Sequence, residues 1–295
     1  MNANSLKYGL IIGLLRMIAI MPLWVLYPIS SCLCVVAHYV VRYRVKVVRK
    51  NLRNAFPLKS DKELRRIEKK FYRNFCDIII ETIKLLHISD RQLKRRVELI
   101  NTELIDEIVE QRRPIIAFLG HCGNWEWVPA LTLKISEPKQ MGALYKPLRN
   151  KVMNKVILKI RSRFSQECIP VKSAYRRLLE LKRQDKTFII GFIADQRPVG
   201  QPLHNWTTFM GQPTAFMAGG ETIGDKVDAR FVYFDIMRRG RGRYSITFTD
   251  MQVDPDDKDE FPYTRLFYRL LENSINRQPD SWLWSHNRWS AKKPS

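Results

Sequence analysis

The stretch that decides the fold is residues 115–127, which read IIAFLGHCGNWEW. It opens with a short apolar run of the kind that is typical of a buried β-strand. A polar turn follows, and Gly120 and Gly123 permit the backbone conformations that a tight turn needs. Asn124 can cap a helix that begins near Trp125. The segment therefore predicts a strand, a sharp corner and a helix, with an imidazole and a carboxylate at the corner.

Outward from this corner, short apolar runs alternate with helical patterns. We expect strands at Pro114–Leu119, Gly142–Tyr145, Cys168–Val171, Phe188–Ala194, Arg230–Arg238 and Tyr244–Thr249. We expect helices at Trp125–Lys134, Lys151–Arg163, Tyr175–Arg183, Thr214–Ile223 and Tyr263–Asn276, with the acidic run Asp254–Glu260 as a loop before the last one. Strands that alternate with helices indicate an α/β fold, in which helices cover both faces of one sheet.

The corner carries a candidate catalytic pair, His121 and Glu126. Five residues on a regular helix rotate by about 500°, so the two side chains meet only if the backbone turns between them. His121 would then act as a general base on an acceptor hydroxyl, and Glu126 would hold the imidazole in the right tautomer. Amides at the turn could stabilise an oxyanion. A histidine and a glutamate at this spacing also occur by chance in many proteins.

The surrounding residues make the pair more specific, because Gly-His-x-Gly-Asn-Trp-Glu resembles the His-x4-Asp/Glu signature of the lipid A late acyltransferases. More distantly, it is similar to the signature of the glycerolipid acyltransferases. Other segments resemble the same family in the same order: Tyr145-Lys146-Pro147 with Asn150, Arg161-Ser162-Arg163, Ala194-Asp195-Gln196, Phe209-Met210-Gly211 with Thr214-Ala215, and Trp284-Ser285-His286-Asn287-Arg288-Trp289. One departure is Lys146, where the family often has arginine. A guanidinium could make a bidentate contact with a phosphate or carbonyl, whereas the lysine ammonium acts as a point charge.

This resemblance implies a glycerolipid-acyltransferase-like mixed sheet with helices on both faces. An apolar N-terminal membrane helix or hairpin and an amphipathic helix would precede that sheet. It implies an O-acyltransferase that takes a fatty acyl chain from acyl carrier protein. The acceptor would be the hydroxyl of a 3-hydroxyacyl group on a lipid A precursor, and the product an acyloxyacyl ester. The alternative is acylation of a glycerolipid, ornithine lipid or phosphoinositol mannoside from acyl-CoA or acyl carrier protein. No cofactor and no metal is implied.

The resemblance also implies a set of site residues beside the catalytic pair. Arg161 and Arg163 would face phosphates of the glycolipid or the donor, where a guanidinium fits well, although an ordinary basic helix end is the alternative. Asp195 and Gln196 follow an apolar strand, at the end where α/β sheets place ligands. Asp195 could orient Arg161 or a substrate hydroxyl, or it could be a structural cap. The full substrate-binding set is Asn124, Tyr145, Lys146, Asn150, Arg161, Arg163, Asp195 and Gln196.

The N-terminal part is the most apolar stretch, from Leu6 to Val41. Such a run is long enough to cross a bilayer, which needs ~20 residues in a helix. Prolines at positions 22 and 28 leave two readings open: a tilted span with an interfacial helix, or a hairpin that dips into one leaflet. A buried core helix is a third. A basic collar follows (Arg42, Arg44, Lys46, Arg49, Lys50 and Arg53). Because positive flanks stay cytoplasmic, we expect a membrane anchor over 1–45 and an acyltransferase domain over 46–295 at the cytoplasmic side of a bacterial inner membrane.

Charge and cysteine content limit the possible partners. The chain carries 51 Lys and Arg against 29 Asp and Glu, a net charge of +22, which calls for an anionic partner. No nucleic-acid motif is present, so acidic lipid or acyl carrier protein is favoured. The five cysteines are scattered, as in a chain with reduced thiols. Cys32 and Cys34 lack a second ligand pair for a metal, and neither Cys122 nor His286 is expected to act as a second catalytic group.

Overall fold

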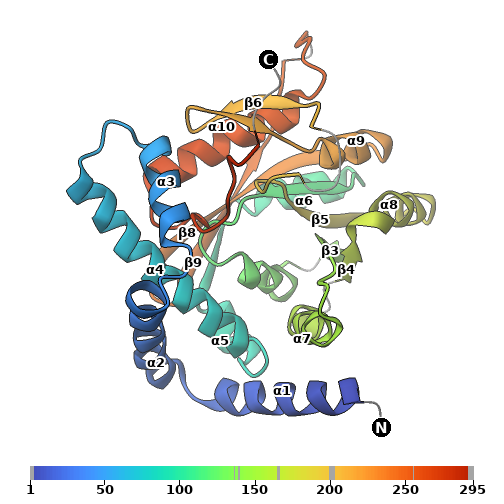
Figure 1. Cartoon of the computed structure of the whole chain (residues 1–295). Coiled ribbons are helices and arrows are strands. Elements are labelled where there is room, and N and C mark those ends of the chain that lie inside the picture. The colour runs from blue at the N-terminus through green and yellow to red at the C-terminus, as the bar shows by residue number, and fades with distance from the viewer. Residues whose placement is uncertain are drawn as a thin grey trace.

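A seven-stranded mixed sheet forms the centre of the computed structural model, which describes residues 3–135, 137–138, 140–164, 167–198, 203–254 and 256–291 (Figure 1). The strands lie in the order β1-β9-β8-β2-β5-β3-β4. Their bounds are β1 Val97–Ile100, β2 Ile115–Leu119, β3 Gln140–Tyr145, β4 Glu167–Pro170, β5 Phe188–Ile193, β8 Arg230–Gly240 and β9 Arg243–Asp250, and a separate hairpin consists of β6 Trp206–Phe209 and β7 Gln212–Ala215.

Helices connect the strands and cover both faces of the sheet, so the predicted α/β class is confirmed. The α-helices are α1 Ala3–Ile20, α2 Leu23–Val35, α3 Val45–Ala55, α4 Asp61–Lys84, α5 Asp90–Lys94, α6 Glu103–Glu110, α7 Lys151–Arg161, α8 Ala174–Arg183, α9 Gly219–Lys226 and α10 Pro262–Arg277. Shorter helical segments are η1 Val36–Val40 (a π-helix) and the 3₁₀ segments η2 Trp125–Leu133, η3 Ser162–Phe164 and η4 Val171–Ser173.

Strand β2 occupies the middle of the sheet and pairs in parallel with β5 on one side and β8 on the other. All five of its residues are buried, as a strand covered on both faces requires. In the β2–β5 pair Leu119 lies opposite Ile193, so the two strands end level with each other. The segments that follow them therefore emerge side by side at one edge of the sheet.

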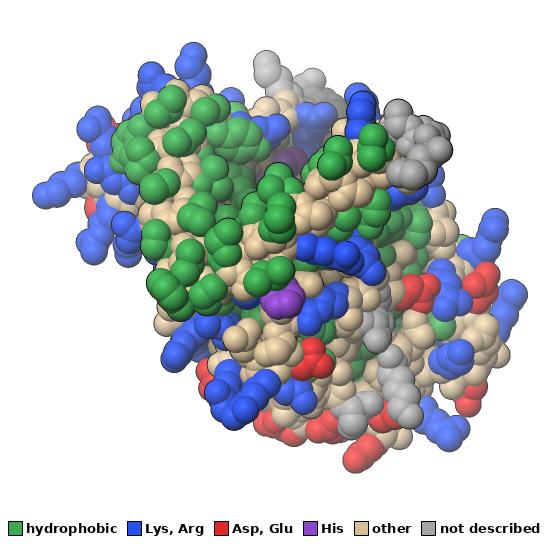
Figure 2. Space-filling model, turned by 90° about the horizontal axis from the view of Figure 1, so that it is seen from below, with side chains coloured by type: hydrophobic (Ala, Val, Ile, Leu, Met, Phe, Trp, Pro, Cys, Tyr) green, Lys and Arg blue, Asp and Glu red, His purple; other side chains and the backbone are tan. Residues whose placement is uncertain are grey.

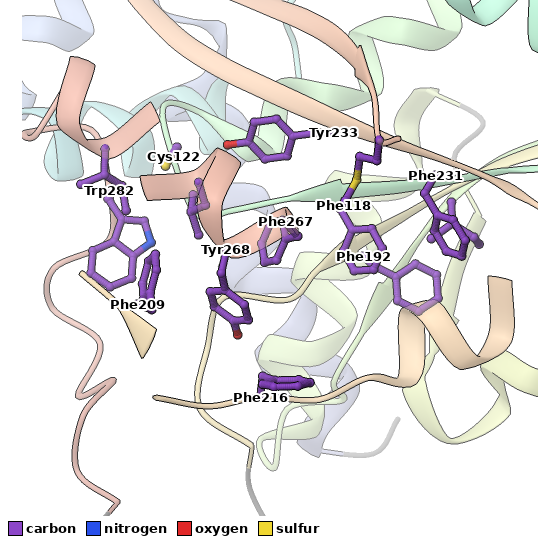
Figure 3. Packing of buried hydrophobic residues seen from close by; sticks show 14 of the residues in the cluster. Phe118, Cys122, Phe192, Phe209, Phe216, Phe231, Tyr233, Phe267, Tyr268 and Trp282 are labelled. Carbon is purple, nitrogen blue, oxygen red and sulfur yellow. The ribbon is translucent and has the colours of Figure 1, made fainter. Parts of the chain in front are cut away.

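Two hydrophobic layers form because alternate residues of each strand point to opposite faces. On one face Phe118 packs against Phe267 of α10, with the ring centroids 5.3 Å apart. Figure 3 shows this layer, in which Phe192 and Phe231 from the neighbouring strands lie beside Phe118. The opposite face is covered by η2, α5, α6 and α7. The candidate site lies at the strand ends next to this second layer.

The apolar N-terminus is two helices, because the chain breaks at Met21 and Pro22 between α1 and α2. Helix α1 lies against α7 and α4, whereas its outer side exposes a stripe of large apolar residues. Figure 2 shows that apolar side chains gather in a broad band on this face, with Lys and Arg side chains around it. Exposed members are Leu6, Leu10, Leu14, Met17, Ile20, Met21, Trp24, Ile29, Val35 and Val36.

Helix α2 continues into η1 without interruption. Among the described residues, the segment Leu23–Val40 is the only helix that is long and apolar enough to cross a membrane, and only 22% of its residues are buried. The interpretation of this stretch as a buried core helix is therefore wrong. The amphipathic helix expected between the apolar N-terminus and the sheet is confirmed as α4, which begins with a capping box between Ser60 and Glu63.

Three local predictions differ from the structure. The segment from Trp125 is a 3₁₀ helix, because Pro129 inside it has no N–H for α-helical bonding. Thr214 lies in strand β7, so the helix expected at Thr214–Ile223 begins only at Gly219. Strand β1 and the β6–β7 hairpin were not expected, since each is only four residues long.

Candidate active site

The corner after β2 is held by the C-terminal segment of the chain. The backbone N–H of Leu283 donates to the His121 carbonyl at 3.0 Å, and that of Gly123 donates to Ser281 at 3.1 Å. Gly123 has φ +54°, and a Cβ there would lie 2.8 Å from a side-chain carbon of Ile236. Only glycine fits this turn without strain. The predicted corner is therefore confirmed.

Asp195 holds the imidazole of His121. The His121 Nδ1 lies 2.6 Å from Asp195 Oδ1, and the His121 backbone N–H donates to Oδ2 at 3.1 Å. Trp282 adds a third hydrogen bond from its indole N–H to Oδ2 at 2.7 Å. The contact follows from the sheet, because each side chain stands two residues beyond the paired strand ends Leu119 and Ile193.

The carboxyl of Asp195 is ionised at neutral pH. Its burial alone would raise its pKa, but the His121 imidazolium and the hydrogen bonds from His121 and Trp282 outweigh burial and lower the pKa to about 2. A carboxylate accepts hydrogen bonds and donates none, so the His121 Nδ1 must carry the proton. The Nε2 atom is then the basic nitrogen, and it lies 3.1 Å from the side-chain amide nitrogen of Gln196.

The expectation that Glu126 holds the imidazole is wrong, since the Nδ1 position belongs to Asp195. Glu126 instead pairs with Arg161: the Arg161 Nε donates to Glu126 Oε2 at 2.8 Å, and Nη2 donates to Oε1. The indole of Trp125 also donates to Glu126 at 3.2 Å, and the same ring packs edge-on against His121 with centroids 4.9 Å apart. Glu126 thus lies near His121 without bonding to it. Arg161 Nη1 has no hydrogen-bond partner within the described part of the chain.

Asn124 faces inward, so its prediction as a substrate-binding residue is not supported. The side chain is 1% exposed, and both of its polar atoms are used inside the protein. Its Nδ2 donates to Glu81 Oε2 at 2.7 Å, and its Oδ1 accepts from the Glu126 backbone N–H at 3.2 Å. The predicted helix cap is confirmed. Asp195 likewise contacts other protein groups through both of its oxygens.

The remaining predicted residues lie at different distances from the corner. Tyr145 ends β3 and is partly buried, whereas Lys146 is exposed in the loop that follows. Asn150 caps α7 by accepting from the backbone N–H groups of Val152 and Met153. Arg163 donates to the Leu85 carbonyl at the end of α4 at 2.5 Å. Their roles toward a substrate stay predictions.

An apolar pocket opens beside the Glu126–Arg161 pair. It lies between η2 and the face of the sheet formed by β2, β5 and β3. Gly142 and Gly191 provide part of its wall without side chains. The other lining residues are mostly aliphatic or aromatic: Ala117, Leu119, Trp125, Val128, Pro129, Leu131, Thr132, Met141, Ala143, Leu144, Ile189, Ile193 and Phe234. The indole of Trp125 lines the pocket and also packs against His121, so the apolar pocket adjoins the corner after β2.

The imidazole of His286 and the thiol of Cys122, which lie near the corner, have structural roles. His286 accepts a hydrogen bond from the Arg197 backbone N–H through Nε2, and burial lowers the pKa of its imidazole to about 4. Burial raises the pKa of the Cys122 thiol well above its ordinary value, which keeps that thiol protonated. No group of three or more His, Cys, Asp or Glu side chains able to hold a metal occurs among the residues that the structure describes.

Comparison with known proteins points to one family. Residues 2–291 match the family model described as "Bacterial lipid A biosynthesis acyltransferase". A similar curated protein is the lipid A biosynthesis lauroyltransferase of Escherichia coli (strain K12), which is 23% identical over 287 residues. That alignment covers 95% of this chain and 90% of the relative. The family match includes α1, α2 and the corner after β2.

Proposed function

Because the chain belongs to the bacterial lipid A biosynthesis acyltransferase family, we propose that it transfers a fatty acyl chain from acyl carrier protein to a hydroxyl of a lipid A precursor. The ester formed would join the new chain to a 3-hydroxyacyl group already on the glycolipid. The observation that carries the proposal is the His121 imidazole, which a buried carboxylate holds and which packs against Trp125 in the wall of an apolar pocket. General-base acyl transfer needs a base at the acceptor hydroxyl, and a fatty donor needs an apolar surface for its chain.

His121 is the general base of the proposed reaction. Its Nε2 takes the proton of the acceptor hydroxyl as the oxygen attacks the thioester carbonyl carbon. When the tetrahedral intermediate collapses, the carbon–sulfur bond breaks and the imidazolium returns this proton to the leaving thiol. Asp195 keeps the proton on Nδ1 and stabilises the imidazolium between the two steps. Gln196, which lies against Nε2 in the free enzyme, gives way to the hydroxyl.

We assign Glu126 to the placement of Arg161. The paired carboxylate fixes the guanidinium at the rim of the apolar pocket, and the arrangement leaves Nη1 available. A guanidinium at this place can donate to the thioester oxygen as negative charge develops on it. Glu126 therefore contributes to the chemistry through Arg161, a different role from the one expected of a histidine partner.

The apolar pocket is the proposed binding site for the acyl chain of the donor. Its wall is almost entirely hydrocarbon, so a fatty chain gains about 0.8 kcal/mol for each CH₂ group that it buries there. The two glycines that line the pocket leave room next to the sheet. The length of the pocket would then select the length of the chain.

The exposed apolar band of α1 and α2 supports a membrane location for the reaction, because the acceptor is a lipid. Basic residues that follow this band favour the cytoplasmic leaflet of the inner membrane, where anionic headgroups attract them. The net charge of +22 also suits an acidic carrier protein, which a basic surface attracts electrostatically.

A reconstitution experiment tests donor and acceptor together. The purified protein in mixed micelles receives either acyl carrier protein or coenzyme A charged with the same acyl group. It is offered a lipid A precursor, a lysoglycerolipid or an ornithine lipid, and the products are weighed by mass spectrometry. We expect one added acyl group on the lipid A precursor with the carrier-protein donor. Transfer only to another lipid, or only from coenzyme A, would overturn the corresponding part of the proposal.

A matched control is the His121→Ala variant, assayed in the same micelles. Loss of the general base should lower turnover by about 10²–10⁴-fold, the usual contribution of such a group. Equal turnover in this variant would contradict the mechanism even if the product is as expected. In cells, the lipid A of a strain that lacks the gene should be lighter by one acyl group.

A further inference from the structure

A carboxyl group lies fully buried behind the catalytic corner. Glu81 is on the inner side of α4 and has no exposed surface. Three side chains from three other parts of the chain donate to it: Tyr244 of β9 at 2.7 Å, Asn124 at 2.7 Å and Tyr27 of α2 at 3.2 Å. The indole of Trp127 donates to the backbone carbonyl of the same residue at 3.2 Å. Glu81 is thus the point where α2, α4, β9 and the corner meet.

The contact with Asn124 decides how that amide is turned. An asparagine amide presents an oxygen at one end and an N–H donor at the other, and the two orientations fill the same space. Glu81 offers an acceptor, so the donor end must face it. The Asn124 oxygen is then directed at the backbone N–H of Glu126, which it accepts at 3.2 Å. With the amide reversed, both contacts would be lost.

Within the part of the chain that the structure describes, no cationic side chain forms an ion pair with Glu81. The nearby guanidinium groups of Arg238 and Arg241 bond to Asp77, one turn earlier on α4. Burial raises the pKa of Glu81 to about 7, although the hydrogen bonds from Tyr244 and Asn124 act in the opposite direction. A carboxyl in such surroundings disfavours its charged form. Because packing alone does not favour a buried carboxyl at this place, we expect Glu81 to have another role.

We infer that Glu81 is a positioning residue for the acyl transfer proposed above, and that it acts by orienting Asn124 and, through it, the Glu126–Arg161 pair. The path has three links, each a hydrogen bond in the structure: Glu81 to Asn124, Asn124 to the Glu126 amide, and the Glu126 carboxylate to Arg161. Glu81 itself lies behind the corner and lines no part of the pocket. This inference rests on the proposed function for its kinetic consequence alone.

A double-mutant cycle on kcat tests the path. Glu81→Leu, which removes the acceptor, and Asn124→Ala should each lower kcat by about 10- to 100-fold, because a shift of about 1 Å in a reacting group can cost about 100-fold. KM for the donor should change by less than about threefold, since the pocket wall is untouched. If Glu81 acts through Asn124, the double variant should be no slower than Asn124→Ala alone. Independent, multiplying losses would overturn the inference.

A rescue by exchange sharpens the test. In the double variant Glu81→Gln with Asn124→Asp, the donor and the acceptor are exchanged. The amide nitrogen now at position 81 donates to the carboxylate now at position 124. The other oxygen of that carboxylate still accepts from the Glu126 amide. We expect this pair to regain at least tenfold in kcat over Asn124→Asp alone, in which two carboxyl groups face each other. No regain would count against orientation as the role of Glu81.

The matched control is Tyr72→Phe. Tyr72 is a buried residue of the same helix, and its hydroxyl donates to the Tyr43 carbonyl away from the corner. Its loss removes a buried hydrogen bond from α4 without touching Asn124, so kcat should remain within about twofold. If Glu81→Leu does not fold, Tyr244→Phe replaces it, because this change removes one of the hydrogen bonds that hold the carboxyl in place. That variant should lower kcat in the same direction.

Amide hydrogen exchange separates this inference from the proposed function. Peptides that cover residues 119–128 should exchange faster in Glu81→Leu and in Asn124→Asp, and at the wild-type rate in the pair Glu81→Gln with Asn124→Asp; no substrate is needed to see this. If the wild-type enzyme fails to acylate a lipid A precursor but exchange responds as described, the proposed function fails and the orientation of the corner by Glu81 stands. Unchanged exchange in Glu81→Leu would overturn the inference, whatever the enzyme acylates.

Discussion

Replacing Asp195 by asparagine should nearly abolish turnover while the fold stays intact. The Asp195→Asn change keeps the shape of the side chain, but an amide N–H donor can now face His121 Nδ1, which lies 2.6 Å from the present carboxylate oxygen. The ring then takes the opposite tautomer, with its proton on Nε2, where the acceptor hydroxyl needs a free lone pair.

The expected magnitude has two parts. The pKa of Asp195 lies at about 2 in place of the ordinary 3.8, in spite of burial, and this difference corresponds to about 2–3 kcal/mol of stabilisation of the charged pair. Losing that stabilisation of the imidazolium in the transition state would slow the reaction by about 10²-fold. The wrong tautomer adds to this loss, so we expect kcat to fall by about 10³–10⁴-fold, as for other histidine bases that lose their carboxylate.

The assay is the rate of acyl transfer at saturating donor and acceptor, with circular dichroism as the test of folding. Asp235→Asn is the matched control, because Asp235 is equally buried but bonds to Ser274 and Arg277 of α10. A folded Asp195→Asn enzyme that keeps its kcat within about threefold of the wild type would refute the assignment of Asp195 to His121.

Three further variants test other parts of the site. Glu126→Gln removes the negative partner of Arg161 and should lower kcat by about 10- to 100-fold, comparable to losing a transition-state donor; a rate equal to wild type would argue against the pair. In Gly191→Ala the new methyl would meet its nearest neighbour, Leu119, at 3.5 Å, so the fold tolerates it and the pocket narrows. Competition between donors should then favour shorter acyl chains, and an unchanged preference would place the chain elsewhere. The pKa of the His286 imidazole is about 4 in the folded protein and has its ordinary value of 6.5 in the unfolded chain. As the pH falls from about 6.5 to 4, the unfolded chain therefore binds a proton that the folded protein does not bind, and the free energy of unfolding decreases. Because this imidazole is partly exposed, we expect a loss of only about 1 kcal/mol at pH 5, absent in His286→Gln in urea denaturation; equal acid sensitivity of both proteins would contradict it.

The corner after β2 was predictable because its signals are local. The apolar run of β2 needs no information from elsewhere in the chain, and the glycine at position 123 marks a left-handed turn that the structure confirms. Asn124 as a helix cap follows from the same few residues. The identity of the histidine partner was not local. It depends on which strand lies next to β2, and periodicity does not encode strand order.

One signal could have pointed to Asp195. His121 and Asp195 each stand two residues after the end of a buried apolar strand, and the ends of neighbouring parallel strands meet at one edge. Sequence reasoning instead favoured Glu126, because it is close in the chain. Glu81 and Trp282 gave no comparable signal, since their contacts with the corner join segments far apart in sequence.

The docking of the last residues on the corner has a consequence for how the enzyme becomes active in the cell. Trp282 supplies one of the donors to Asp195, and the strand-like contact between Cys122 and Trp282 joins the middle of the chain to its end. A polypeptide still on the ribosome has made β2 and β5 long before this segment is synthesised. The corner can therefore be completed only after synthesis has passed residue 282, and we expect a chain cut short before that residue to be inactive.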